Sequence, residues 1–141
     1  MQVNFESLVN WKQQSDYLRC SPSFYHQERY DCILIHGKDH PFFARLVLLF
    51  TSAIAEQTYP LALIQPYNAP IGHRSRKDKD LRFWRVRAKP RLSTEFISVH
   101  SIIRGVLLVP DFEAPGDYLV VDGIDTDMFL RINAMRKAAG Y

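Results

Sequence analysis

One stretch of the sequence combines positive charge with aromatic rings. Residues 74–91, "RSRKDKDLRFWRVRAKPR", hold nine of the eighteen Lys and Arg residues of this 141-residue chain. Lys and Arg neutralise phosphates, and a flat ring beside a guanidinium group can stack on a base or a sugar. The pattern indicates a nucleic-acid contact surface. Its ordinary alternative is a well-solvated loop and strand, which is what most charge runs form.

Charge is unevenly distributed along the chain. Residues 72–91 carry nine cations and two carboxylates, a net charge of +7, so the other residues sum to −4 because the total is +3. Residues 111–127 hold six acids and no Lys or Arg. Such separation lets one face attract a polyanion despite a small total charge. The candidate nucleic-acid contacts are Arg74, Arg76, Lys77, Lys79, Arg82, Phe83, Arg85, Arg87, Lys89 and Arg91.

A second group of residues could support metal-dependent chemistry. Asp122, Asp125 and Asp127 follow an apolar run, and converging carboxylates can hold two metal ions. Asp125 and Asp127 equally suit the first turn of a helix. His36 and His40 would share a face only on a helix, whereas "HGKDHP" has the composition of a turn. We therefore expect no catalytic residue, metal, cofactor or small-molecule substrate.

Three tyrosines could serve a different purpose. Tyr59, Tyr67 and Tyr118 could line a cage for a methylated ammonium group, as in a histone-tail reader. More often such rings belong to the core or rim of a β domain. Both interpretations are open at this stage.

The elements that must position these residues are mostly strands. Short apolar runs separated by turn residues predict strands at residues 29–36, 42–51, 58–67, 81–88, 95–99, 104–110 and 117–123. The period-two positions Phe42, Ala44, Leu46, Leu48 and Phe50 should form one buried face.

Two of these strands have special features. Pro60 and Pro66 lack ladder donors, which favours an edge or bulged position for residues 58–67. In residues 81–88, alternation directs Trp84, Val86 and Ala88 inward. The same alternation directs Phe83, Arg85, Arg87 and Lys89 to an outer surface.

The end of the chain changes to a helical period. Met128, Ile132 and Met135 recur at helical spacing after Thr126, a possible N-cap, and Arg136 and Lys137 suit the last turn. This pattern predicts a helix over about residues 126–139. Residues 7–22, "SLVNWKQQSDYLRCSP", suggest a second, short helix that ends before Pro22.

Length and composition favour one domain spanning residues 1–141, with an N-terminal extension of about residues 1–28. Strands without long intervening helices predict an antiparallel barrel or sandwich. Cys20 and Cys32 suggest reduced thiols. The apolar residues 42–55 are too few to span a bilayer, and the first residues do not resemble a signal peptide. We expect an intracellular protein without a membrane partner.

Several ordered phrases carry a family resemblance: "DYLRC.P.F" (16–24), "RYDC" (29–32), "FARLV" (43–47), "YPLALIQPY.AP" (59–70), "KDKDL" (77–81) and "EFIS...IIRG.LLVPDF...DYLVVD" (95–122). Together they resemble the carboxy-terminal region of Plavaka/KDZ-type transposase-like proteins of mushroom-forming basidiomycete fungi. The resemblance implies a segment outside the catalytic core, a nuclear setting and DNA nearby.

A looser resemblance concerns architecture. The strand order and the placement of Glu95, Ser98, Ile103, Gly105 and Val109 are similar to the bromo-adjacent homology (BAH) domain. This similarity implies a bent antiparallel β-barrel of the kind that chromatin proteins use to bind histones, other proteins or nucleosomes.

These observations give two functional hypotheses. The first is a non-catalytic DNA- or chromatin-binding accessory module of a transposase-derived protein, in which case charge reversal of Arg85 and Arg87 should abolish DNA retention and leave the fold intact. The second is a protein-interaction or self-association domain with an apolar or aromatic surface. Added salt separates them, because only phosphate binding weakens steeply as ionic strength rises.

Overall fold

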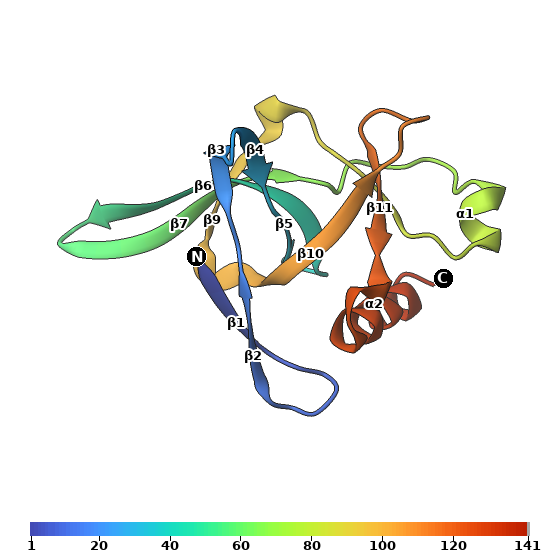
Figure 1. Cartoon of the computed structure of the whole chain (residues 1–141), viewed down its shortest axis with the longest axis horizontal. Helices are drawn as coiled ribbons and strands as arrows, with labels where there is room; N and C mark the ends of the chain where they lie inside the picture. Colours follow the sequence, from blue (N-terminus) through green and yellow to red (C-terminus); the bar gives the residue numbers. More distant parts are fainter. Residues whose placement is uncertain (141) are drawn as a thin grey trace.

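The computed structural model describes residues 1–140 and is mainly β with one C-terminal helix (Figure 1). Its strands are β1 (Gln2–Glu6), β2 (Gln13–Tyr17), β3 (Cys20–Phe24), β4 (Gln27–Tyr30), β5 (Cys32–Ile35), β6 (Phe42–Ile54), β7 (Gln57–Pro66), β8 (Arg85–Arg87), β9 (Glu95–Ser98), β10 (Ile102–Pro110) and β11 (Asp117–Val121). The helices are α1 (Arg76–Asp80) and α2 (Thr126–Ala138). Short 3₁₀ turns are η1 (Arg91–Ser93), η2 (Val99–Ser101) and η3 (Asp122–Ile124).

Seven strands form one antiparallel sheet in the order β8-β11-β10-β5-β6-β7-β9. The sheet is open, because its outer strands β8 and β9 do not pair with each other within residues 1–140. The mainly β class with a C-terminal helix is confirmed, and the closed, BAH-like barrel stays a prediction. Figure 1 shows the β6–β7 hairpin projecting at one end of the molecule, with α1 and α2 at the other.

The N-terminal region forms hairpins instead of the predicted helix. β1 pairs with β2, and β3 pairs with β4. In β1, Val3 and Phe5 are buried while Asn4 and Glu6 face solvent, which is the period of a strand with one covered face. The helix prediction for residues 7–22 was wrong because this alternation begins before residue 7 and β2 itself is almost wholly polar.

A bulge divides the long strand β6. Its pairing with β7 shifts between Leu46 and Leu48, so one extra residue lies on β6. Before the bulge Ala44 and Leu46 are buried, and after it Leu49 packs on the same cluster while Leu48 is exposed. The predicted face of even-numbered residues therefore ends at the bulge, since one extra residue turns every later side chain to the other side.

The two prolines of β7 lie at positions where the pairing with β9 requires no backbone N–H donor. β7 is not an edge strand, because it pairs with β6 and with β9. β9 pairs only with residues 61–64, so Pro60 and Pro66 flank that segment. The strand tolerates both prolines because neither is required to donate to β9.

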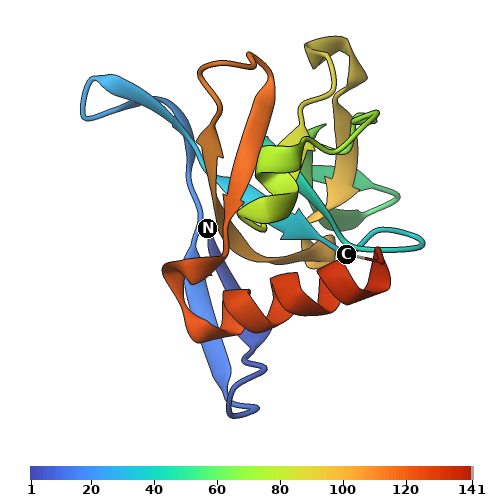
Figure 2. The ribbon, with the colours of Figure 1, turned by 90° about the vertical axis from the view of Figure 1, so that its right-hand side faces the viewer.

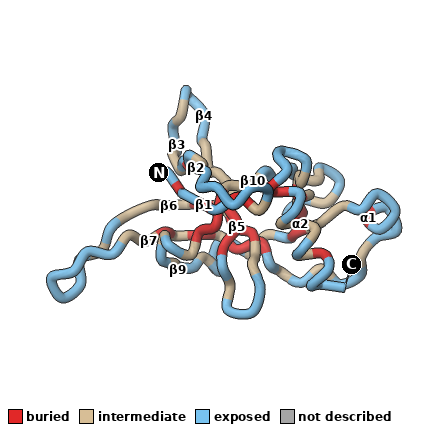
Figure 3. Tube along the Cα trace, turned by 90° about the horizontal axis from the view of Figure 1, so that it is seen from below, coloured by how far each residue is buried: buried red, intermediate tan, exposed pale blue. Residues whose placement is uncertain are grey.

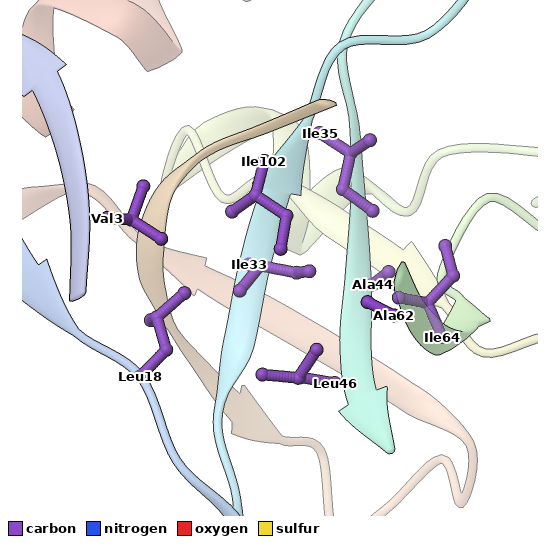
Figure 4. Close-up of a cluster of buried hydrophobic side chains, with 9 residues drawn as sticks. All are labelled: Val3, Leu18, Ile33, Ile35, Ala44, Leu46, Ala62, Ile64 and Ile102. Atoms are coloured by element: carbon purple, nitrogen blue, oxygen red, sulfur yellow. The ribbon is translucent and has the colours of Figure 1, made fainter. Parts of the chain in front are cut away.

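Each face of the sheet buries its own apolar cluster. Ile33 and Ile35 of β5 point to one face, where the β1–β2 hairpin adds Val3 and the following Leu18 (Figure 4). Leu34 points to the opposite face. Figure 3 shows the buried residues gathered where β5 and its neighbours meet, with exposed hairpin tips.

Helix α2 covers the second cluster. Met128 and Ile132 are fully buried and Met135 packs beside them, so the predicted helical face is confirmed. The N-cap is Asp125 instead of Thr126, because the Asp125 carboxylate accepts a hydrogen bond from the Met128 amide at 2.7 Å. A carboxylate here also interacts favourably with the positive end of the helix.

Candidate interaction surface

The basic segment folds into a helical turn followed by a short strand. Ser75 caps α1 by accepting a hydrogen bond from the Asp78 amide at 3.1 Å. The strand predicted over residues 81–88 is only β8, Arg85–Arg87. As predicted, Trp84, Val86 and Ala88 pack inward on the second apolar cluster.

Arg85 is held by carboxylates. Its guanidinium group binds both oxygens of Asp78, at 2.7 and 3.1 Å, and donates to Asp111 at 2.7 Å and Asp117 at 3.3 Å. Hydrogen bonds from Arg85 hold the pKa of Asp78 below its ordinary value although burial opposes this. The expectation that Arg85 is displayed on an outer surface is therefore wrong, because the neighbouring acids are within reach.

Arg87 and Arg74 also have partners inside the fold. Arg87 donates to Asp117 at 2.6 and 3.1 Å, although its side chain remains partly exposed. Hydrogen bonds from Arg87 lower the pKa of Asp117. Arg74 donates to the carbonyl oxygens of Asp78 and Phe83, which closes the loop around α1.

The other predicted cations divide into two places. Arg76, Lys77, Lys79 and Arg82 are exposed on α1 and at its C-terminal end. Arg76 lies 3.5 Å from Asp80, and both side chains are solvent-exposed, so this pair contributes little. Lys89 and Arg91 lie beyond β8, and Lys89 is half-buried beside β7, where its amide donates to Pro66. The predicted basic surface is therefore reduced mainly to the α1 turn.

The three tyrosines of the predicted cage do not come together. Tyr67 and Tyr118 stack with centroids 4.8 Å apart, and Tyr67 is buried. Tyr59 lies on the β6–β7 hairpin, opposite Ser52. Eight residues of extended chain separate it from Tyr67, a distance of roughly 26 Å.

The C-terminal acids bind arginines. Arg104 has only 3% of its side chain exposed and binds Asp16, Asp125 and Asp127 at 3.2, 2.7 and 2.8 Å. Burial opposes ionisation of Asp127, yet hydrogen bonds from Arg131, the Leu8 amide and Arg104 lower its pKa overall. The cluster thus joins β10, α2 and the N-terminal hairpin.

The third predicted acid has a similar role. Asp122 accepts a hydrogen bond from Arg136 of α2 at 2.9 Å. Among residues 1–140, no group of three or more His, Cys, Asp or Glu side chains is arranged to hold a metal ion. Sequence reasoning missed Arg104, whose signal was a lone cation within the apolar run "SIIRGVLLV".

A groove of about 900 Å³ lies between the C-terminal end of α1, strands β10 and β11, and α2. Figure 2 shows α1 in yellow-green above α2 in red, the two helices that contribute to this groove. Exposed or half-buried apolar side chains form much of its wall: Leu81, Phe83, Val109, Leu119, Phe129 and Leu130. Phe83, predicted as a stacking ring, is therefore a half-buried wall residue.

The end of α1 beside this groove has a particular backbone geometry. The Arg82 amide donates to the backbone carbonyl oxygen of Lys79, and the Phe83 amide donates to that of Asp78. These two hydrogen bonds are the Schellman pattern of a helix end. This pattern places Arg82 at a φ of 56°, in the left-handed region where glycine is usual. Arg136 of α2 donates a hydrogen bond to the Arg82 carbonyl oxygen at 2.7 Å, which holds the Arg82 backbone in place.

The fold and its contacts define a mainly β domain with a lateral groove. Comparison with models of known protein families, with curated proteins and with solved structures found no match to this chain. None of the helices in residues 1–140 is long and apolar enough to cross a bilayer. The resemblances to transposase-like proteins and to the BAH domain stay predictions.

Proposed function

We propose that this protein is a non-catalytic interaction module that binds another protein in the groove beside α2. The observation that carries the proposal is the concentration of solvent-accessible apolar side chains on that groove. Phe129, for instance, keeps 46% of its surface exposed although it lies on the helix that covers the core. Partly exposed aromatic residues in a concave site are the usual anchors of protein interfaces.

The test compares two equivalent substitutions. Phe129→Ser removes a groove wall, whereas Phe112→Ser removes an aromatic ring that is 88% exposed in the turn between β10 and β11 and is not a groove residue. Proteins retained from nuclease-treated source-cell extract should be recovered with the parent and with Phe112→Ser but not with Phe129→Ser. Equal recovery with all three would overturn the proposal.

Contact with DNA is a second candidate, supported by Arg76, Lys77, Lys79 and Arg82, which remain exposed on one turn. It would rest on fewer cations than the sequence suggested, because Arg85 and Arg87 are engaged. A random duplex titrated at two salt concentrations tests it. The double substitution Arg76→Glu and Lys79→Glu should weaken retention, and unchanged retention would exclude this surface.

The wider setting is also a proposal. We retain as predictions a bent BAH-like barrel, a transposase-derived origin and a nuclear location. They rest on the sequence phrases alone. A solved structure of a Plavaka/KDZ-type carboxy-terminal region would test the first two directly.

A further inference from the structure

We propose that the groove binds an acidic segment with large apolar side chains and that Arg82 recognises its carboxylates. This inference rests on the proposed function and adds the chemistry of the partner. The groove is lined by more positive than negative charge. Arg82, Arg136 and Lys137 are cations and Asp122 is the carboxylate, so three positive charges less one negative charge leave +2.

The carboxylate of the groove is already engaged. Asp122 accepts a hydrogen bond from Arg136 at 2.9 Å. Arg82 and Lys137 are exposed, and neither has a carboxylate partner among the described side chains. Lys77 and Lys79 add positive charge on the adjoining helix. A partner that covers this groove would leave Arg82 and Lys137 unpaired unless it supplied acids.

The apolar walls define the second requirement. Leu81 at the end of α1, Val109 of β10, and Phe129 and Leu130 of α2 are exposed groove residues. A polyanion without apolar side chains would leave these walls exposed to water. The groove therefore matches acidic and apolar side chains on one segment better than it matches a phosphate backbone.

The backbone at Arg82 is an independent observation. An L-residue in the left-handed region costs roughly 1–2 kcal/mol, and helices most often place glycine at this position. Here the position carries an exposed arginine beside the groove. Strain of this kind is maintained where the surrounding structure enforces it, and Arg136 does so through its 2.7 Å hydrogen bond.

This geometry yields a diagnostic substitution. Arg82→Gly removes the charge and suits the backbone, so it should weaken partner binding without lowering the melting temperature. Ala55→Gly is the matched control, because Ala55 also has a positive φ of 48° but lies in the exposed β6–β7 turn. Ala55→Gly should relieve backbone strain as much as Arg82→Gly does and leave partner binding unchanged.

The probe is a displayed library of random peptides of about 16 residues, enough for four helical turns. It is selected on the parent, Arg82→Gly, Ala55→Gly, Phe129→Ser and Phe112→Ser proteins. The most enriched peptide is then synthesised, together with a version in which every Asp and Glu is replaced by Asn and Gln. Fluorescence anisotropy measures both affinities.

We expect the parent and the two control variants to enrich peptides that are both acidic and apolar. The amide version should bind the parent about tenfold more weakly, and Arg82→Gly should bind the acidic peptide about three- to tenfold more weakly than the parent does. Phe129→Ser should lose both peptides.

Different failures have different meanings. Enriched peptides that require Phe129 but show no acidic preference, or that bind Arg82→Gly as tightly as the parent, would overturn this inference and leave the proposed function standing. Peptides that bind Phe129→Ser and the parent equally would overturn both.

Discussion

The Arg85 guanidinium group donates two hydrogen bonds to the Asp78 carboxylate, at 2.7 and 3.1 Å. This ion pair connects strand β8 to the buried side of helix α1. Asp78 is only 1% exposed, so its charge depends on this partner. The same guanidinium reaches the turn before β11 through Asp111. The ion pair therefore organises the segment that forms one wall of the groove.

Replacing Arg85 should lower the free energy of unfolding. Arg85→Ala leaves Asp78 buried without its partner, which typically costs about 3–5 kcal/mol of unfolding free energy. Arg76→Ala removes a neighbouring but solvent-exposed pair and should change stability by less than about 0.5 kcal/mol. Urea unfolding followed by circular dichroism measures both. Similar midpoints for the two variants would contradict this role of Arg85.

Because Arg85 and Arg87 bind carboxylates inside the fold, reversing their charges should affect folding as well as DNA binding. From the sequence alone, reversing Arg85 and Arg87 was expected to remove DNA retention and preserve the fold. The structure instead predicts repulsion with Asp78 and Asp117 at the centre of the network. Loss of retention in that double variant would report unfolding, so Arg76 and Lys79 are the informative positions.

Sequence patterns predicted the elements better than their connections. The C-terminal helix and most strands follow from apolar periodicity, because each buries a regular face. The β6 bulge and the first hairpin do not. Glycine did not mark the β1–β2, β3–β4 and β6–β7 turns, since Trp11, Tyr25 and Ala55 adopt positive φ values of 59°, 48° and 48° there.

The candidate site was less predictable because its chemistry depends on distant partners. Arg85 is separated from Asp111 and Asp117 by more than 20 positions, so alternation could give its side of the strand but not its ion pairs. Arg82 offered no signal of a helix end, since it occupies a position where glycine is usual. The groove itself arises only when α2 packs beside β11.

Acid should destabilise the protein through these carboxylates. Hydrogen bonds from Arg85 and Arg87 lower the pKa values of Asp78 and Asp117 in the folded state. The unfolded chain therefore binds protons first, near the ordinary Asp pKa of about 3.9. The stabilisation should be complete above about pH 5 and decline as pH falls through the folded pKa values.

Urea midpoints measured across this pH range test the prediction. Asp80→Asn is the control, because Asp80 is solvent-exposed and its pair with Arg76 contributes little to stability. Asp117→Asn should lower stability at neutral pH and flatten part of the acid decline. Equal midpoints for the parent near pH 6 and near pH 3 would show that these carboxylates do not stabilise the fold.

Two glycines should respond oppositely to the same substitution. A Cβ on Gly37 would collide with the carbonyl oxygen of His40 and approach the Phe42 ring at 3.1 Å, whereas a Cβ on Gly72 meets nothing within 4 Å. Gly37→Ala should cost about 1–3 kcal/mol because backbone must move. Gly72→Ala should be neutral or stabilise by up to about 1 kcal/mol by restricting the unfolded chain. A higher melting temperature for Gly37→Ala than for Gly72→Ala would contradict the close backbone contacts of Gly37 in the β5–β6 turn.

The thiol of Cys32 should resist alkylation in the folded protein. Burial raises its pKa to about 11, although the nearby positive charge of Arg45 favours the thiolate. Because the thiolate is the reactive form, Cys32 should react with iodoacetamide at neutral pH about 100-fold more slowly than an ordinary cysteine. Mass spectrometry of timed samples gives the rate, and the protein unfolded in urea supplies the reference rate for the same residue. Equal rates in the folded and unfolded states would mean that β5 and β6 do not enclose this thiol.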